Sequence, residues 1–271
     1  MDAFFEKCFS LQDPRKFKRE NERFFRWVYD DLKVIVQCCD DPENLVEFTK
    51  FVVFFGAEDD PEIMDLLTDQ VLRSMRRLGT DSVLEIVVNF AVTLSPNAQD
   101  VFDAANQEFG QRLRHEYYDY KSIGDLFVKP EDLIKILNVL LDHKQLQPGL
   151  KEQIIETMRD QRKDYTYDLM AEIAVIFATK MDPKYRAEYF NNFLQKFQND
   201  IEYLKEETLY KILWSFIKAE RLVVREDAYD WFCIRQSIQK KAKDMSPKIL
   251  TNILVLSTQA KDHEFKMEEV G

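Results

Sequence analysis

The chain has little glycine, with six residues among 271, and it contains no Asn-Gly pair. Tight β-hairpins depend on such residues, because their turns need positive φ angles. A sheet-rich fold is therefore disfavoured. An all-helical fold needs few glycines and agrees with this composition.

Long apolar runs are also absent. The longest candidates, residues 51–55 and 83–94, are short or interrupted by Glu85 and Asn89, so they fall below the roughly 20 residues that span a bilayer. The N-terminus lacks the basic and apolar regions of a secretory signal, and Asp2 and Glu6 disfavour a cleavable mitochondrial presequence. We expect a soluble protein or a peripheral subunit, with membrane contact at most peripheral.

Cysteine is sparse and forms no C-x-x-C motif. The adjacent Cys38 and Cys39 cannot form an unstrained bridge with each other. Cys8 and Cys233 lie far apart in the sequence. We interpret all four as reduced residues of an intracellular protein.

Positive charge is in deficit, because 38 Lys and Arg face 49 Asp and Glu, which gives a net charge of −11. Nucleic-acid binding relies on cations that neutralise phosphates, so nucleic acid is an unfavoured partner. Residues 15–26 are an exception, and this basic stretch contains Arg15, Lys16, Lys18, Arg19, Arg23 and Arg26. We interpret it as the solvated face of an amphipathic helix, with an electrostatic contact to a partner or membrane surface as the alternative.

Motifs for catalysis, cofactors or metals are missing. His115 and Asp119 have the i, i+4 spacing of a zincin helix but lack its second histidine, and His143 and His263 lie far away. No phosphate-binding glycine motif occurs, and the acidic residues before prolines are typical of helix caps. Cys233 and Trp214 lie at positions expected to pack in a core. We therefore predict no enzyme activity, no cofactor and no catalytic, cofactor-binding or metal-binding residue.

An apolar pattern recurs through the chain at intervals of 38, 50, 37, 39 and 41 residues. A fixed period of 20 to 50 residues is typical of stacked repeats. Six anchor segments carry it: Leu45/Phe48, Val83/Ile86/Val87, Leu133/Ile136/Leu137, Met170/Ile173, Leu209/Ile212/Leu213 and Leu250/Ile253/Leu254.

The eight prolines fall between these apolar segments, and six of them follow an Asp or Ser that can cap a helix. The first helix is predicted at 14–38, with Phe17, Phe24, Val28, Leu32 and Ile35 on one stripe. Later helices are predicted in pairs: 43–55 with 61–78, 81–94 with 96–118, 130–143 with 148–162, 167–180 with 183–199, and 206–219 with 225–243. An unpaired helix at 247–260 ends the series.

These patterns predict an all-α fold, an α-solenoid of about five to six antiparallel helix pairs with roughly 38-residue repeats. We expect one repeat domain over 1–271, with a capping helix in 1–41, helix pairs in 43–260 and a polar tail in 261–271. The long interval is explained by an insertion near 109–128, where Tyr117, Tyr118 and Tyr120 lie. Insertions in repeat proteins often lie on the binding face, so this segment is a candidate partner contact.

Segments such as 132–141 (DLIKILNVLL) and 208–217 (TLYKILWSFI) resemble octotricopeptide and FAST-kinase-like helical repeats, over about residues 43–258. HEAT-like repeats are the competing resemblance. The first families are largely organellar and commonly bind RNA, and some members serve as structural subunits of mitochondrial assemblies. This chain differs from them in its acidity and in the absence of a nuclease-like C-terminal segment.

The leading hypothesis is a non-catalytic scaffolding subunit of a large multiprotein assembly, which binds other protein subunits. The resemblance places it in mitochondria, and a cytoplasmic scaffold is the alternative location. The alternative function is an organellar RNA-binding repeat protein, although few cations occur at matching positions of the more apolar helices. An enzyme would require a deep pocket with converging polar groups.

Overall fold

The computed structural model describes residues 13–39, 41–93, 95–118, 129–160, 165–219 and 229–268. Within these ranges the regular structure consists of α-helices and short 3-10 turns, without a strand. The predicted all-α class is therefore confirmed. A search of the described helices finds none with the length and apolar character to cross a membrane.

The chain divides into two compact units, Met1–Gln161 and Arg162–Gly271, and each is described by itself. The expectation of a single repeat domain stays a prediction. The helices of the first unit are α2 (Pro14–Glu20), α3 (Glu22–Gln37), α4 (Glu43–Phe55), α5 (Pro61–Ser74), α6 (Thr80–Ala91), α7 (Ala98–Tyr118), α8 (Pro130–Asp142) and α9 (Pro148–Asp160). Those of the second are α10 (Tyr167–Lys180), α11 (Pro183–Asp200), α12 (Glu206–Lys218), α13 (Tyr229–Lys241) and α14 (Pro247–Glu268).

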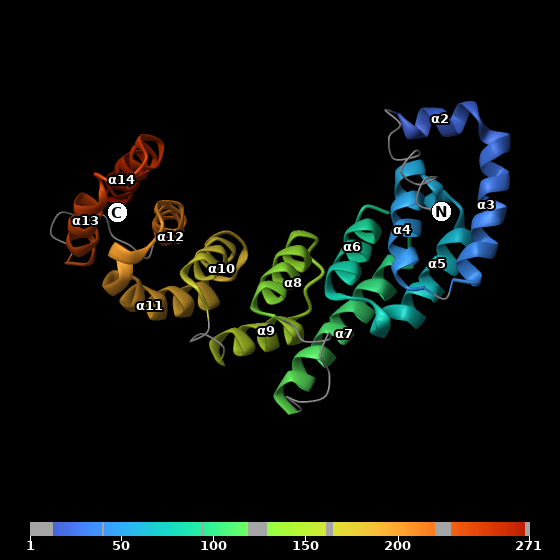
Figure 1. The fold of residues 1–271 in the computed structure, drawn as a ribbon, viewed down its shortest axis with the longest axis horizontal. Coiled ribbons are helices and arrows are strands. Elements are labelled where there is room, and N and C mark those ends of the chain that lie inside the picture. Colours follow the sequence, from blue (N-terminus) through green and yellow to red (C-terminus); the bar gives the residue numbers. More distant parts are fainter. Residues whose placement is uncertain are drawn as a thin grey trace. The chain divides into compact units, whose positions relative to one another are not determined.

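Helices of the first unit contact the helix two places further along the chain (Figure 1). One row runs from α2 through α4 and α6 to α8, and the other from α3 through α5 and α7 to α9. Consecutive helices also contact each other across the rows, as in α4 with α5, α6 with α7 and α8 with α9. Each interior helix is thus covered by neighbours on several sides.

The second unit repeats this pattern of contacts. Its first row runs from α10 through α12 to α14, while α11 contacts both α10 and α13. The predicted anchors form the core of both units, and those of α4, α6, α8, α10 and α12 are buried. The last anchor differs, because Ile253 is buried while Leu254 is 60% exposed.

Prolines mark helix starts as predicted. Pro14, Pro61, Pro130 and Pro183 occupy the first turn of their helices. The Asp60 carboxylate accepts hydrogen bonds from the backbone N–H groups of Glu62 and Ile63, and Asp13 accepts one from Lys16. These side chains satisfy donors that have no partner inside the helix.

The predicted single helix at 14–38 is wrong. Asn21 separates α2 from α3, and its backbone N–H and its side-chain amide both donate to the carbonyl of Phe17. The buried residues of α3 also differ from the predicted stripe: Phe25, Leu32 and Val36 are buried, whereas Phe24 and Ile35 are exposed. At the other end, α14 continues past the predicted residue 260 to Glu268, so most of the predicted polar tail is helical.

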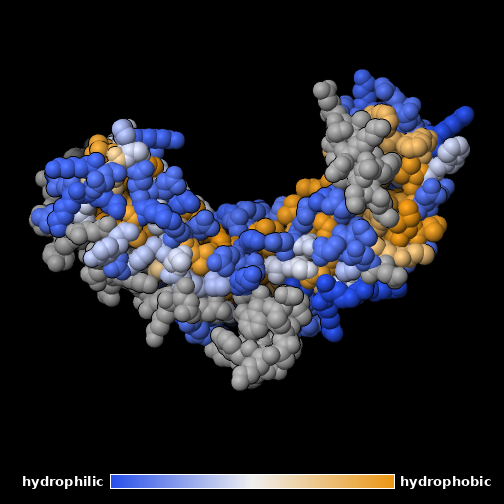
Figure 2. All heavy atoms as spheres, viewed as in Figure 1, coloured by the Kyte–Doolittle hydropathy of each residue, from blue (hydrophilic) through white to orange (hydrophobic). Residues whose placement is uncertain are grey.

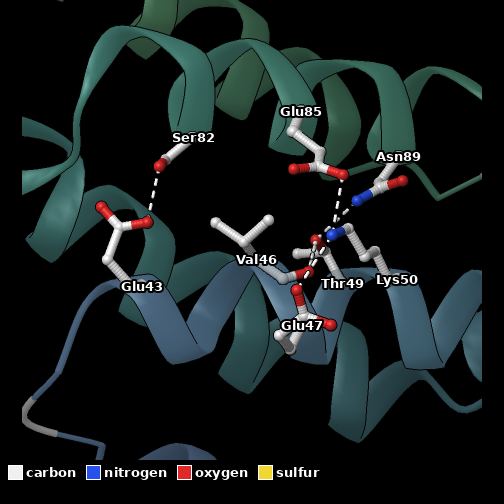
Figure 3. Close-up of polar contacts among 8 residues, drawn as sticks. All are labelled: Glu43, Val46, Glu47, Thr49, Lys50, Ser82, Glu85 and Asn89. Atoms are coloured by element: carbon white, nitrogen blue, oxygen red, sulfur yellow. Dashed lines mark hydrogen bonds and ion pairs between the residues drawn. The ribbon is translucent and has the colours of Figure 1, made fainter. Parts of the chain in front are cut away.

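Polar contacts between neighbouring row helices join residues about one repeat apart. Between α4 and α6, Ser82 donates to Glu43 at 2.6 Å over 39 positions, and Asn89 donates to Thr49 at 2.9 Å over 40 positions (Figure 3). Lys50 Nζ lies 2.9 Å from carboxylate oxygens of both Glu47 and Glu85. These bonds fix how far one helix is shifted along the next.

The second unit has the same kind of polar contact between neighbouring row helices. Lys205 donates to Asp168 at 2.7 Å over 37 positions, and the Thr208 hydroxyl donates to the same carboxylate over 40 positions. The backbone N–H of Ser246 donates to Glu206 at 2.6 Å, again over 40 positions. The spacing of these polar contacts is therefore close to the spacing of the apolar anchors.

Arg112 of α7 is the most deeply buried cation of the described ion pairs, with a side chain 4% exposed. It donates to Glu108 at 2.8 Å and to the carbonyl of Leu78 at 2.7 Å. The second bond ties α7 to the connection between α5 and α6. A buried ion pair that loses one partner leaves the other charge uncompensated.

We expect Arg112→Met to lower the free energy of unfolding by about 3–5 kcal/mol in chemical denaturation. The double variant Arg112→Met, Glu108→Leu should recover part of this loss, because no unpaired carboxylate stays buried. The matched control is Arg73→Met, whose side chain is 72% exposed. A loss for Arg112→Met no larger than for the control would contradict the role of this ion pair.

The pH dependence of stability should report the Asp168 contact. Hydrogen bonds from Lys205 and Thr208 hold the pKa of Asp168 below its ordinary value. A carboxyl with a lowered folded-state pKa stabilises the fold above its unfolded-state pKa, and this contribution is lost as the pH falls through the folded-state pKa. The stability difference between wild type and Asp168→Asn should therefore shrink as the pH is lowered from about 6 to about 3. Asp244→Asn, an exposed position of the same unit, is the control, and a constant difference for Asp168→Asn would refute the assignment.

Candidate interaction surfaces of the terminal helices

Three of the four cations of α2 lie on one side of this short helix. Arg15, Lys18 and Arg19 are spaced i, i+3 and i+4, which places them on one helical face. No residue of α2 is buried. Its place in the row is set by contact with α4, because the Lys18 ammonium donates to the carbonyl of Gly56, the residue that ends α4.

Gly56 has a φ of 64°, the left-handed conformation that closes a helix C-terminus and favours glycine. A side chain there would also meet Arg15, whose Nε lies 3.5 Å from the position of a Cβ atom. At this distance a Cβ atom would be in ordinary van der Waals contact, so it is the backbone conformation that favours glycine here.

An open pocket of about 860 Å³ lies beside this contact. The cationic face of α2 forms one wall, and the floor includes Phe55 and Met64, which are both buried. Val92, at the end of α6, also lines the pocket and is 58% exposed. The pocket thus combines cations with apolar surface.

The two acids of the pocket already have partners. Glu58 lies 3.1 Å from Arg15, and Asp65 accepts a hydrogen bond from the Asn97 amide at 2.6 Å. Lys18 binds a carbonyl oxygen and lies 5.3 Å from the centre of the Tyr29 ring. Arg19 is exposed at the pocket wall.

Helix α3 has apolar residues on two opposite sides. One side, with Phe25, Leu32 and Val36, is buried, and α3 contacts α5. The other side is exposed to solvent, although its residues follow an apolar helical spacing. Its apolar residues are Phe24, Trp27, Val34 and Ile35, which are 47%, 73%, 60% and 38% exposed, and the exposed Asp31 lies among them, four positions from both Trp27 and Ile35.

Figure 2 shows the same feature as orange surface over α3, at the right edge of the view. In the described structure, α3 is the first helix of its row, whereas α5 is covered by α3 on one side and α7 on the other. The exposed side of α3 therefore resembles a helix surface whose neighbour is missing. Apolar surface of this kind typically marks a site of protein contact.

Helix α14 has a smaller surface of this type. Ile253 and Leu256 are buried, while Leu254 and Val255 are 60% and 48% exposed. It contacts α12 and is the last described helix of its row. Of this exposed pair, Leu254 lies at a position where the other row helices bury an anchor.

Hydrogen bonds and ion pairs hold α3 on α5. Lys33 Nζ lies 2.6 Å from Glu62, and this hydrogen bond is the main reason why the pKa of Lys33 is raised. The side chain of Gln70 donates to the carbonyl of Gln37 at 3.2 Å. The buried face of α3 is therefore fixed, so its exposed face has a defined orientation.

The residues considered for chemistry do not gather into a site. His143 is half-buried at the C-terminal end of α8, and Trp214 is half-buried in α12. The described residues contain no group of three or more potential metal ligands. Cys38 is a free cysteine, and the thiol of Cys39 donates to the carbonyl of Asp41 at 3.0 Å.

The remaining candidates lie outside what the structure describes. Asp119, Tyr120 and Cys8 belong to residues whose placement is not described. The same holds for the side chains of His115, Tyr117, Tyr118, Cys233 and His263. Helix α7 extends to Tyr118, and residues 119–128 of the predicted insertion are outside the described ranges.

Comparison of the sequence with models of known protein families and with curated proteins finds no match.

Two adjacent phenylalanines test the orientation of α3. Phe25 is 3% exposed, and its ring centre lies 5.0 Å from that of Phe55, so Phe25→Ala should cost about 3–5 kcal/mol of unfolding free energy. Phe24→Ala, one position away, should cost less than about 1 kcal/mol, because its side chain is already half in water. Both are measured by urea denaturation, and equal losses would show that the outer face of α3 is covered in the isolated protein.

Proposed function

We propose that this chain is a non-catalytic α-solenoid that serves as a scaffolding subunit of a larger protein assembly. Six helix pairs, from α2 with α3 to α12 with α13, and the unpaired α14 would make up the stack. The support is that the apolar anchors and the polar contacts between row helices have similar spacings, and that within each unit row helices contact the helix two places further on. Stacked repeats produce such agreement, because each unit contacts only its neighbours.

The observation that carries the scaffold function is the exposed apolar face of α3. Trp27 is 73% exposed, and Phe24, Val34 and Ile35 extend the same face. Monomeric proteins rarely leave such aligned apolar side chains in water, since their burial is worth about 25 cal/mol per Å². A partner subunit that covers this face would recover that free energy.

The resemblance to octotricopeptide and FAST-kinase-like repeats supports a mitochondrial assembly as the setting. A HEAT-like scaffold in the cytoplasm is the alternative. Both settings share the same mechanism, in which a rigid row of helices holds other subunits through its exposed faces.

A specific observation also favours RNA binding as the second candidate function. The exposed cations Arg15, Lys16 and Arg19 lie close to the exposed rings of Phe17 and Trp27 in the sequence. Single-stranded nucleic acid is bound by such combinations of cations and aromatic rings. The net charge of −11 opposes it, because the overall field repels phosphates.

The scaffold function predicts stoichiometric protein companions. An affinity-tagged chain purified from its native cells should retain them, and Trp27→Glu with Val34→Glu should release them, because two charges would enter the apolar contact. Tyr203→Glu is the control, since Tyr203 is 82% exposed in the other unit. Circular dichroism checks that each variant is folded.

A monomeric chain without companions would contradict the scaffold function. Companions that disappear after ribonuclease treatment, together with an RNA gel shift that weakens with salt, would establish the RNA-binding alternative instead.

A further inference from the structure

We propose that the pocket beside α2 binds an acidic peptide segment of a partner protein, anchored by one apolar side chain. This inference rests on the proposed scaffold function and names the chemistry of one partner. Five charged residues line the pocket: Arg15, Lys18, Arg19, Glu58 and Asp65.

The charged side chains of this pocket, three cations and two acids, carry a net positive charge. Glu58 is paired with Arg15, and Asp65 accepts the amide of Asn97. Lys18 donates to a backbone carbonyl, and in the part of the chain that the structure describes no carboxylate pairs with Lys18 or Arg19. Two cations are therefore available to carboxylates of a ligand. Hydrogen bonds between a cation and a carboxylate are about twice as strong as those between neutral groups.

The apolar part of the pocket determines the second property of the ligand. Phe55 and Met64 form a buried floor, while Val92 is 58% exposed at the pocket surface. An apolar side chain seated there would cover Val92, because Phe55 and Met64 are already buried. Carboxylates on either side of that side chain would then reach Lys18 and Arg19.

The shape of the pocket favours a peptide over a membrane or a nucleic acid. Its wall and floor come from α2, the end of α4, the start of α5 and the connection between α6 and α7. A flat bilayer would touch the outer side of α2 without entering this space. A nucleic-acid strand carries a charge on every nucleotide, so it would bring phosphates close to Glu58 and Asp65.

Fluorescence anisotropy of a labelled synthetic peptide tests the proposal on the purified full chain. The probe has a central Leu flanked by Glu and Asp, and two matched peptides carry Lys in place of the acids or Ser in place of the Leu. The acidic Leu peptide should bind, with an affinity that falls as salt is raised. The other two should bind at least about tenfold more weakly.

Arg19→Glu and Val92→Asp should each weaken binding of the acidic Leu peptide by at least about tenfold. Lys248→Glu makes the same charge change as Arg19→Glu at an exposed site of α14, in the other unit, and should leave binding unchanged. Because Arg19 and Val92 are exposed, their variants should keep the wild-type unfolding midpoint.

Several outcomes would overturn the proposal. They are equal binding of the three peptides, insensitivity to Arg19→Glu, and stronger binding of RNA or phosphatidylserine vesicles through the same cations. Binding that appears only after removal of residues 1–12 would identify the chain's own segment as the ligand and would also overturn it.

The experiments can distinguish a failure of the scaffold function from a failure of the pocket proposal. Companions that depend on Trp27 but no binding of the acidic peptide would leave the scaffold function standing and remove the pocket ligand. Peptide binding without any companion would contradict the scaffold function and keep the pocket as a peptide site.

Discussion

The packing of each row helix against the helix two places further on is the interaction on which this structure depends. In unit 1 it joins α4 to α6 and α6 to α8, and in unit 2 it joins α10 to α12 and α12 to α14. The contact is apolar at the anchors and polar at its edges, and both components use a spacing of about 40 residues. Because burial depends on neighbours alone, a helix at the end of a row keeps one apolar side in water. The exposed faces of α3 and α14 follow from the same interaction that forms the core.

Local physical rules explain why much of this fold could be predicted from the sequence. Proline is tolerated in a first helical turn, and apolar residues at i, i+3 and i+4 share a helical face, so Pro61 and Leu133 identify a helix start and a core stripe without tertiary information. The break at Asn21 could not be predicted in this way. Asparagine is tolerated both inside a helix and at its ends. The bond from Lys18 to Gly56, formed across 38 positions, is part of the contact that holds α2 on α4.

The candidate surfaces were only partly visible in the sequence. The cations of residues 15–26 are evident in the sequence. Their position beside Phe55 and Val92 depends on the way in which α2, the end of α4 and the end of α6 come together in the fold. The outer face of α3 did leave a signal. Phe24, Phe25, Val34, Ile35 and Val36 are apolar on both sides of one helix, which is typical of a helix covered by two neighbours. The prediction of one amphipathic helix over residues 14–38 assumed a single apolar stripe and therefore did not use the second apolar side.

The break at Asn21 gives α2 its place beside α4. An uninterrupted helix would continue the axis of α3 at 1.5 Å per residue and would carry Arg15 and Lys18 away from the end of α4. The pocket would then lose its cationic wall. With the break, α2 covers α4 in one row while α3 covers α5 in the other, so the segment behaves as a short helix pair. The cations of that pair line a pocket beside α4 and α5, and its apolar face is left where a further helix would continue the row.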